Sequence, residues 1–395
     1  MRGEPTVGPR DPADLMPWLH FSMVHIRGAV LDRIGLARPY AESRPISVVG
    51  LDLDPPGTDE VMVRIEAAGV CHSDLSVVDG NRVRPVPMLL GHEAAGIVEE
   101  VGPQTEGAVT DLSIGQRVVL VFLPRCGHCA ACATEGLTPC EAGTAANTTG
   151  TLLGGGIRLG RAGHPVYHHL GVSGFATRAV INRASAVPVP HDVPPEVAAL
   201  LGCAVLTGGG AVLNVGNPRP GQSVAVVGLG GVGMAAVLTA LTYDDVRVVA
   251  VDRLPDKLAA ARAVGAHEAY TPRQAIDAGV KATVVIEAVG HPAALETAIG
   301  LTAPGGRTIT VGLPPPEARI SMSPLDFVAE GRSLIGSYLG SAVPSRDIPR
   351  FVSLWRSGRL PVESLVSSTL RLDDINEAMD HLADGTAVRQ LIRFD

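Results

Sequence analysis

Four cysteines within fifteen residues constrain the fold of this chain more than any other feature of its sequence. They lie in "CGHCAACATEGLTPC" with the spacing C-x2-C-x2-C-x7-C. Such short links turn several thiolates toward one centre, as a tetrahedral structural zinc ion requires. Bacterial iron–sulfur proteins use a similar run with a shorter last gap, so zinc is favoured, and an iron–sulfur cluster and buried or redox-active thiols are the alternatives. The predicted ligands are Cys126, Cys129, Cys132 and Cys140.

Two further cysteines, Cys71 and Cys203, lie far apart in the sequence, with His92 and Glu93 between them. Taken singly, each has a plain alternative, because a lone cysteine is usually a small buried residue and a lone histidine usually has a structural role. Together, two thiolates and an imidazole form the set typical of a catalytic zinc with an open fourth position. This interpretation leaves none of the six cysteines unused.

A glycine motif in the second half of the chain predicts a nucleotide site. The apolar run Val224–Val227 is followed by Gly228-Leu229-Gly230-Gly231-Val232-Gly233 and then by a segment of helical character. A buried strand, a tight glycine turn and a helix N-terminus together accommodate the pyrophosphate of a dinucleotide. The next apolar run ends at Asp252, where a carboxylate accepts the ribose hydroxyls of NAD and repels the extra phosphate of NADP. Arg253 follows directly, so NAD is favoured and NADP is the alternative. For Asp252 itself, the alternative is a residue that caps the strand and binds no ligand.

The hydrophobic patterns of the two halves of the chain predict two kinds of sheet. After the glycine motif, the apolar strands Thr283–Gly290 and Arg307–Pro315 alternate with alanine-rich helical segments. This alternation indicates an α/β unit with a doubly wound parallel sheet. In the first half, Val61, Val63 and Ile65 alternate with other residues, which predicts an antiparallel strand with one exposed face.

Composition and charge exclude several classes of function. The chain is 46% hydrophobic and 18% charged, as expected of a globular protein. Its net charge is −8 and its basic residues are scattered, so neither a nucleic acid nor an anionic membrane is an expected partner. Residues 1–22 are polar and interrupted by prolines, unlike a signal peptide, and no window is expected to be apolar enough to span a membrane. We therefore expect a cytoplasmic protein with an N-terminal extension at 1–22.

Taken together, these motifs resemble the zinc-dependent medium-chain alcohol dehydrogenases from about Val24 to the end of the chain. The motifs "GVCHSDL", "GHEAAGIVEEVG", the four-cysteine lobe, "GC…TG" and "GLGGVG" occur in the order and spacing of that family. The segment "HPVYHHLGVSGFA" resembles its longer, liver-type branch, which includes the class III formaldehyde dehydrogenases. The resemblance implies an α/β protein in which a GroES-like, β-rich catalytic domain is split in the sequence around a doubly wound Rossmann domain. It implies a catalytic domain over 23–204 with a zinc lobe at 126–140, a Rossmann domain over 205–338, and a return to the catalytic domain over 339–395.

The resemblance also implies roles for single residues. Cys71, His92 and Cys203 correspond to the ligands of the catalytic zinc. Ser73 corresponds to the hydroxyl that takes the alcohol proton, Asp74 to the acid that orients the ligand histidine, and Glu93 to a carboxylate beside the zinc. Phe122 corresponds to a residue of the substrate pocket, with plain core packing as its alternative. The nucleotide contacts that the motif or the resemblance predicts are His72, Thr207, Gly228, Gly230, Gly231, Val232, Gly233, Asp252, Arg253, Lys257, Val311 and Arg389; for His72, Lys257 and Arg389 a surface charge is the alternative.

The implied reaction is hydride transfer between a primary or secondary alcohol, or its aldehyde or ketone, and NAD. Zinc would polarise the substrate oxygen, and two zinc ions per chain are expected. One position departs from the family. Five residues after Cys71 the family commonly has a relay histidine, whereas this chain has Ser76. A serine hydroxyl cannot act as a base near neutral pH, so we expect the proton to leave through water or another group.

Three other functions are compatible with these residues. A thiol-adduct-dependent formaldehyde dehydrogenase would bind the carboxylate of its thiol carrier through a basic residue such as Arg158 or Arg161. A nicotinoprotein would keep its NAD permanently bound, and a zinc-binding regulatory protein would hold zinc without catalysis. The expected partner is a small alcohol or aldehyde, and the expected assembly is a homodimer built by edge-to-edge extension of the Rossmann sheets.

Overall fold

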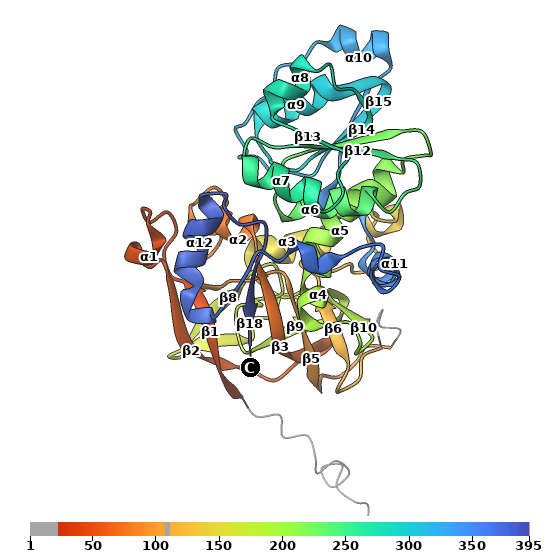
Figure 1. Cartoon of the computed structure of the whole chain (residues 1–395). Helices are drawn as coiled ribbons and strands as arrows, with labels where there is room; N and C mark the ends of the chain where they lie inside the picture. Colours follow the sequence, from red (N-terminus) through yellow and green to blue (C-terminus); the bar gives the residue numbers. More distant parts are fainter. Residues whose placement is uncertain (1–22, 107–110, 395) are drawn as a thin grey trace, which may run out of the picture.

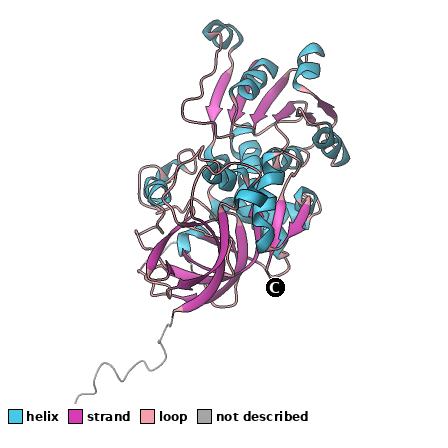
Figure 2. Ribbon diagram, turned by 90° about the vertical axis from the view of Figure 1, so that its left-hand side faces the viewer, coloured by secondary structure: helices cyan, strands magenta, loops and turns pink. Residues whose placement is uncertain are grey.

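Three sheets organise the part of the chain that this computed structural model describes, residues 23–106 and 111–394. The extension expected at 1–22 lies outside the described residues. The first sheet is a closed barrel, and the second is a seven-stranded sheet beside it (Figure 2). The barrel strands are β1 (Val24–Leu31), β2 (Ile46–Leu53), β7 (Leu159–Arg161), β8 (His164–His168) and β4 (Met88–Leu89). The second sheet contains β10 (Ala186–Val189), β6 (Arg117–Leu120), β5 (Ala94–Val101), β3 (Glu60–Val70), β9 (Arg178–Asn182), β18 (Gln390–Arg393) and β17 (Ser368–Leu370).

The strand β3 is antiparallel to its neighbours, as predicted, and the face predicted to be exposed is exposed only in part. Val61, Val63 and Ile65 pack into the large core, whereas Met62 packs into a separate core inside the barrel. The barrel covers this second face at Met62, whereas Arg64 and Glu66 farther along it are half-buried. The same strand pairs with β18 near the end of the chain, so the C-terminus completes a sheet that begins near residue 60.

The third sheet is parallel throughout and follows the glycine motif. Its order is β13 (Glu268–Tyr270), β12 (Arg247–Val251), β11 (Ser223–Val227), β14 (Ala282–Glu287), β15 (Thr302–Thr310) and β16 (Ser333–Gly336). Successive residues of β11 enter two different hydrophobic cores, which is why its sequence is continuously apolar. The helices of this part are α6 (Gly231–Ala240), α7 (Pro255–Ala263), α8 (Pro272–Asp277), α9 (Pro292–Leu301) and α10 (Pro324–Glu330) (Figure 1).

A continuous helical run joins the β-rich part to the parallel sheet. It comprises α4 (Pro195–Leu200), η4 (Leu201–Val205), α5 (Leu206–Gly210) and η5 (Ala211–Gly216). Contrary to the sequence expectation, this run is long and apolar enough to cross a membrane by length and composition, but 89% of its apolar window is buried inside the protein. A Cβ at Gly208 would lie 2.0 Å from the Val232 carbonyl oxygen, so the run packs backbone to backbone on α6. It is therefore a core helix between the two parts, where Figure 1 shows α5.

Candidate active site

Three elements bring the two distant cysteines and the histidine together. Cys71 follows β3 and caps α2 (His72–Val78), His92 lies two residues before β5, and Cys203 lies in the helical run. The ligand atoms of Cys71, His92, Glu93 and Cys203 all lie within 4.8 Å of one another, and all four residues are buried. His92 Nε2 is 3.3 Å from Cys203 Sγ. Tetrahedral zinc bonds require about 3.5 Å between such a nitrogen and sulfur, so the donor set fits a zinc ion.

The charge of Cys71 also suits a metal. A hydrogen bond from the Cys203 thiol lowers the pKa of Cys71, against the opposing effect of burial. Glu93 lies beside the set, and its Oε2 is 3.2 Å from Arg389 Nη1. Burial raises the pKa of Glu93 to about 7, while Arg389 acts in the opposite direction. Gly69 provides room for this carboxylate, because a Cβ there would lie 2.8 Å from Glu93 Cδ.

Asp74 contacts His92, the expected ligand histidine. Its Oδ1 accepts a hydrogen bond from His92 Nδ1 at 3.0 Å, and its Oδ2 accepts one from the Cys71 backbone N–H at 3.1 Å. Burial alone would raise the pKa of Asp74, but the facing His92 and His169 lower it to about 2. The carboxylate therefore stays ionised and can fix the tautomer of His92 with Nε2 free for a metal.

The sequence analysis missed His169 as a site residue. Its Nδ1 lies 3.1 Å from Asp74 Oδ1, the oxygen that also faces His92, and its ring packs edge-on to His92 at 5.5 Å. His169 is buried and comes from the loop after β8. The adjacent histidines of "YHHLG", at the end of β8, were the available signal.

The glycine turn lies next to this metal set. Gly228 has a φ of +92°, and a Cβ at Gly233 would lie 1.7 Å from the Gly228 carbonyl oxygen, so both positions require glycine. Arg389 is buried and donates to the Val70 carbonyl oxygen at 3.2 Å. A Cβ at Gly231 would lie 2.4 Å from Arg389 Nη2. Arg389 therefore reaches from Glu93 to the N-terminus of α6 and is not a surface charge.

Other predicted nucleotide contacts surround the same turn. Asp252 accepts hydrogen bonds from the backbone N–H groups of Leu229 at 2.7 Å and Leu254 at 2.9 Å, which hold the turn against the end of β12. Desolvation lowers the pKa of His72, and the nearby charges of Arg389 and Lys257 lower it further. The two cations, Arg389 and Lys257, thus lie near His72. Arg253 is exposed, Thr207 is buried in the helical run, and the Val311 N–H donates to the Glu287 carbonyl oxygen at 2.9 Å.

The four clustered cysteines also form a donor set for a metal. Their sulfurs all lie within 4.8 Å of one another, with 3.9 Å between Cys126 and Cys132 and 4.0 Å between Cys129 and Cys140. Four sulfurs around a tetrahedral zinc are separated by about 3.8 Å. The backbone N–H of Glu141 contributes most to lowering the pKa of Cys129 to about 6. None of the six cysteines forms a disulfide, so this lobe also fits zinc.

Comparison with known proteins assigns the chain to a family. An alcohol dehydrogenase GroES-like domain matches residues 57–191, and a zinc-binding dehydrogenase domain matches residues 231–357. Geraniol dehydrogenase of Castellaniella defragrans is 37% identical over 381 residues, which cover 94% of this chain and 98% of that protein. The chain belongs to the zinc-dependent medium-chain alcohol dehydrogenases.

Solved structures agree with this assignment. An alcohol dehydrogenase zinc-binding domain protein from Burkholderia ambifaria has a TM-score of 0.86 and 33% identity, and the match covers 95% of this chain and all of that one. Benzyl alcohol dehydrogenase from Acinetobacter calcoaceticus has a TM-score of 0.84 and 29% identity over 94% of this chain and all of that one. The predicted α/β fold class, the family and the zinc oxidoreductase activity are confirmed, and the liver-type branch stays a prediction.

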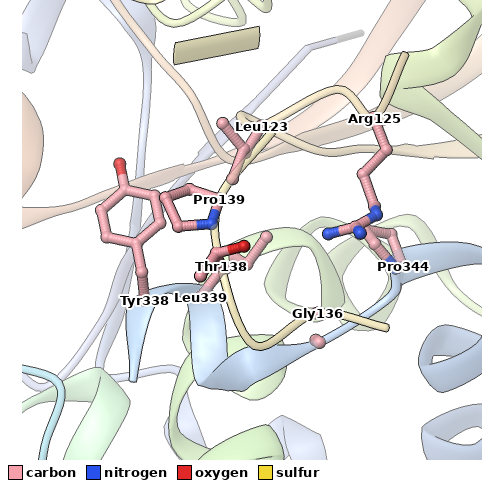
Figure 3. Close-up of a pocket in the computed structure, with 9 residues that line it drawn as sticks. Leu123, Arg125, Gly136, Thr138, Pro139, Tyr338, Leu339 and Pro344 are labelled. Carbon is pink, nitrogen blue, oxygen red and sulfur yellow. The ribbon is translucent and has the colours of Figure 1, made fainter. Parts of the chain in front are cut away.

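Two aromatic rings of the dehydrogenase extend outward from the metal set. The Phe122 ring meets the His92 ring edge-on at 5.5 Å, and the Tyr338 ring meets Phe122 edge-on at 5.9 Å. Phe122 is part of the core and also contacts the ligand histidine. Tyr338 lies against the zinc lobe next to Pro139 and Leu123 (Figure 3). Sequence reasoning missed Tyr338, because it lies more than 200 residues from Phe122.

Two serines on α2 differ in their surroundings. Ser73 is half-buried at the second position of the helix, next to the ligand Cys71. Ser76, at the place of the family's relay histidine, donates its hydroxyl hydrogen to the His72 carbonyl oxygen at 2.7 Å. Its hydroxyl is thus engaged with its own helix.

The arginines considered for a thiol carrier are already paired. Arg158 Nε is 2.7 Å from Glu60 Oε2, and Arg161 forms an ion pair with Asp32. A Cβ at Gly57 would meet the Arg158 guanidinium, which shows how closely this side chain is packed. Neither arginine is therefore a free cation for a substrate carboxylate, which argues against the thiol-carrier role considered for them.

Proposed function

We propose that this dehydrogenase oxidises primary or secondary alcohols with NAD, releasing a carbonyl product, NADH and a proton, and catalyses the reverse reaction. The observation that supports this most is Arg389, which contacts Glu93 beside the metal set and the glycine turn of the nucleotide site. Cys71, His92 and Cys203 are proposed to hold a zinc ion, which supplies Lewis acidity to the substrate oxygen, and the nicotinamide supplies the hydride acceptor. The clustered cysteines are proposed to hold a second, structural zinc.

The side chains around this site have separate proposed roles. Ser73 takes the proton from the alcohol, Asp74 holds His92 in one tautomer, and Phe122 forms a wall of the substrate pocket. Since the Ser76 hydroxyl is bonded to the helix backbone, the proton leaves from Ser73 to water rather than along the usual relay. His72, Lys257 and Arg389 attract the phosphates and ribose of the nucleotide, and Thr207 and Val311 contact the nicotinamide end.

NAD is the proposed cofactor rather than NADP. The Asp252 carboxylate is held by two backbone N–H groups at the tip of β12, and a fixed negative charge there repels a 2′-phosphate. Comparing kcat/KM for the two cofactors tests this. Asp252→Asn keeps the shape of the side chain and removes only its charge, so it should weaken the discrimination against NADP. A preference of the unaltered enzyme for NADP would contradict the proposal.

The domain boundaries, assembly and location are also proposals. The division into residues 23–204, 205–338 and 339–395 is supported by the separate sheets and by the pairing of β18 with β3. A homodimer is supported by β16 at the open edge of the parallel sheet and by exposed Leu325 and Val328 on the neighbouring α10. A cytoplasmic location is supported by the six free thiols. Light scattering of the purified protein tests the dimer.

A substrate panel tests the proposed function. Purified, zinc-loaded enzyme is mixed with NAD and a series of neutral alcohols, and NADH is followed by its absorbance. Oxidation of several alcohols, lost in Cys203→Ser, is the expected result. The absence of any oxidation by a preparation with full zinc content would overturn the proposal. NAD that copurifies in stoichiometric amount would instead identify a nicotinoprotein.

A further inference from the structure

Two arginines near the metal set have no anionic partner in the described part of the chain. Arg82 and Arg84 lie between α2 and β4, and we refer to them as the arginine pair. Both are half-buried, and Arg84 Nε is a buried atom without a hydrogen-bond partner. The paired Arg158 and Arg161 show the more usual arrangement, in which a half-buried guanidinium contacts a carboxylate.

The position of the pair is set by the metal-binding segment. The Arg82 backbone N–H donates to the Ser76 carbonyl oxygen at 2.7 Å, so the loop that carries the pair is tied to the end of α2. The loop then leads within a few residues to the ligand His92. A helix that begins at one metal ligand and a strand that precedes another therefore hold the pair from both sides.

The surroundings of the pair place it along the aromatic rings that lead out from the metal set. Burial raises the pKa of Tyr338, and the charges of Arg82 and Arg84 oppose this effect. Tyr338 reaches His92 through Phe122. The pair thus lies near the outer of the two rings.

Physical chemistry favours an anion at such a position. A half-buried cation without a partner loses hydration and gains nothing in return, and a second cation beside it adds repulsion. A guanidinium offers a planar fork of N–H donors that matches the two oxygens of a carboxylate. The whole chain carries a net charge of −8, so an anionic substrate needs a local positive site to approach the metal set.

We propose that the arginine pair is a subsite for a carboxylate carried by the substrate, so that the preferred substrates are alcohols or aldehydes with a carboxylate group beyond the aromatic rings. This inference rests on the proposed alcohol oxidation and specifies its substrate class. The carboxylate contacts the pair, the linker of the substrate lies against Phe122 and Tyr338, and the carbinol lies at the metal set.

Matched substrates test the inference. The values of kcat/KM are compared for 4-(hydroxymethyl)benzoate and benzyl alcohol, which differ only in the carboxylate, in the unaltered enzyme and in Arg82→Gln and Arg84→Gln. Arg33→Gln, an exposed arginine on the surface, is the control variant. We expect the unaltered enzyme and the control to prefer the carboxylate by about tenfold. Each glutamine variant should remove most of that preference and leave benzyl alcohol within about twofold, and added salt should reduce the preference.

Several results would overturn the inference. These are a preference of the unaltered enzyme for benzyl alcohol, or a preference for the carboxylate that both glutamine variants retain. If Arg84→Gln does not fold, the ratio of kcat/KM for the two alcohols in the unaltered enzyme and in Arg82→Gln tests the inference. If neither alcohol is oxidised, the proposed function fails, and calorimetric titration with benzoate tests the pair separately. Binding that the glutamine variants lose supports the inference, and no binding overturns it.

Discussion

His169→Phe should weaken the hold of this enzyme on its catalytic zinc. Phenylalanine fills nearly the same space in the buried site but removes the imidazole nitrogen that lies 3.1 Å from Asp74 Oδ1. Asp74 then depends on His92 and two backbone N–H groups, those of Cys71 and Gly91, for its contacts. Because Asp74 orients His92, a looser Asp74 allows the ligand imidazole to turn.

The size of the effect follows from the type of contact. A buried contact to an ionised carboxylate contributes about 1.5–3 kcal/mol. If most of that energy orients His92, the loss corresponds to between about 10-fold and 100-fold in zinc affinity or kcat/KM. We expect a loss of at least about tenfold in both quantities. His169→Asn keeps an N–H donor near the position of Nδ1 and should recover part of the loss.

The assay follows zinc release from the purified enzyme to a coloured chelator, with kcat/KM for one alcohol measured on the same preparations. His168→Gln is the matched control, because His168 is equally buried but contacts the Arg158 backbone N–H instead of Asp74. The reasoning is refuted if His169→Phe releases zinc at the rate of the unaltered enzyme, or if His168→Gln releases it as fast as His169→Phe.

Three further predictions concern acid stability, proton release and packing. Burial lowers the pKa of His168 to about 3, so below about pH 6.5 the unfolded chain binds a proton that the folded chain does not, and stability falls. Lowering the pH from 7.5 to 5.5 should reduce the free energy of unfolding by about 1.4 kcal/mol through this residue. Urea unfolding at the two pH values should show that His168→Gln lacks this loss. Ser76→His should raise kcat near pH 6 by restoring a relay base, and an unchanged rate there contradicts the impaired relay. Gly208→Ala should lower the free energy of unfolding by about 1–3 kcal/mol, because its Cβ would meet the Val232 carbonyl oxygen at 2.0 Å. Gly300→Ala in α9 is the control and should not destabilise, because its Cβ would meet nothing within 4 Å. Equal melting temperatures of the two variants would refute the packing argument.

The parts of the site that sequence predicted are those with a short-range signature. The spacing of the four clustered cysteines and of the glycine turn predicts their geometry. In the structure the four sulfurs converge, and the glycines form the tight turn. Cys71, His92 and Cys203 have no such spacing, and they were found from their chemistry and from the resemblance of the surrounding motifs. Their convergence depends on the helical run that joins the two parts of the chain.

The parts that sequence missed depend on neighbours from distant segments. Met62 is buried because the barrel packs against it. The sequence of β3 alone does not predict this contact. His169 gains its role from Asp74, nearly a hundred residues earlier, and Tyr338 from Phe122. The apolar helical run was not recognised because its glycines and Thr207 interrupt the hydrophobic pattern. The run contains almost no charged residue because it lies at the centre of the fold.

The zinc content of the purified protein tests the central claim most directly. Elemental analysis should find two zinc ions per chain in the unaltered enzyme. Cys71→Ser should retain one zinc ion and lose alcohol oxidation, because it removes a ligand of the catalytic set and leaves the four-cysteine lobe intact. A Cys71→Ser enzyme that keeps two zinc ions and still oxidises alcohols would contradict the account.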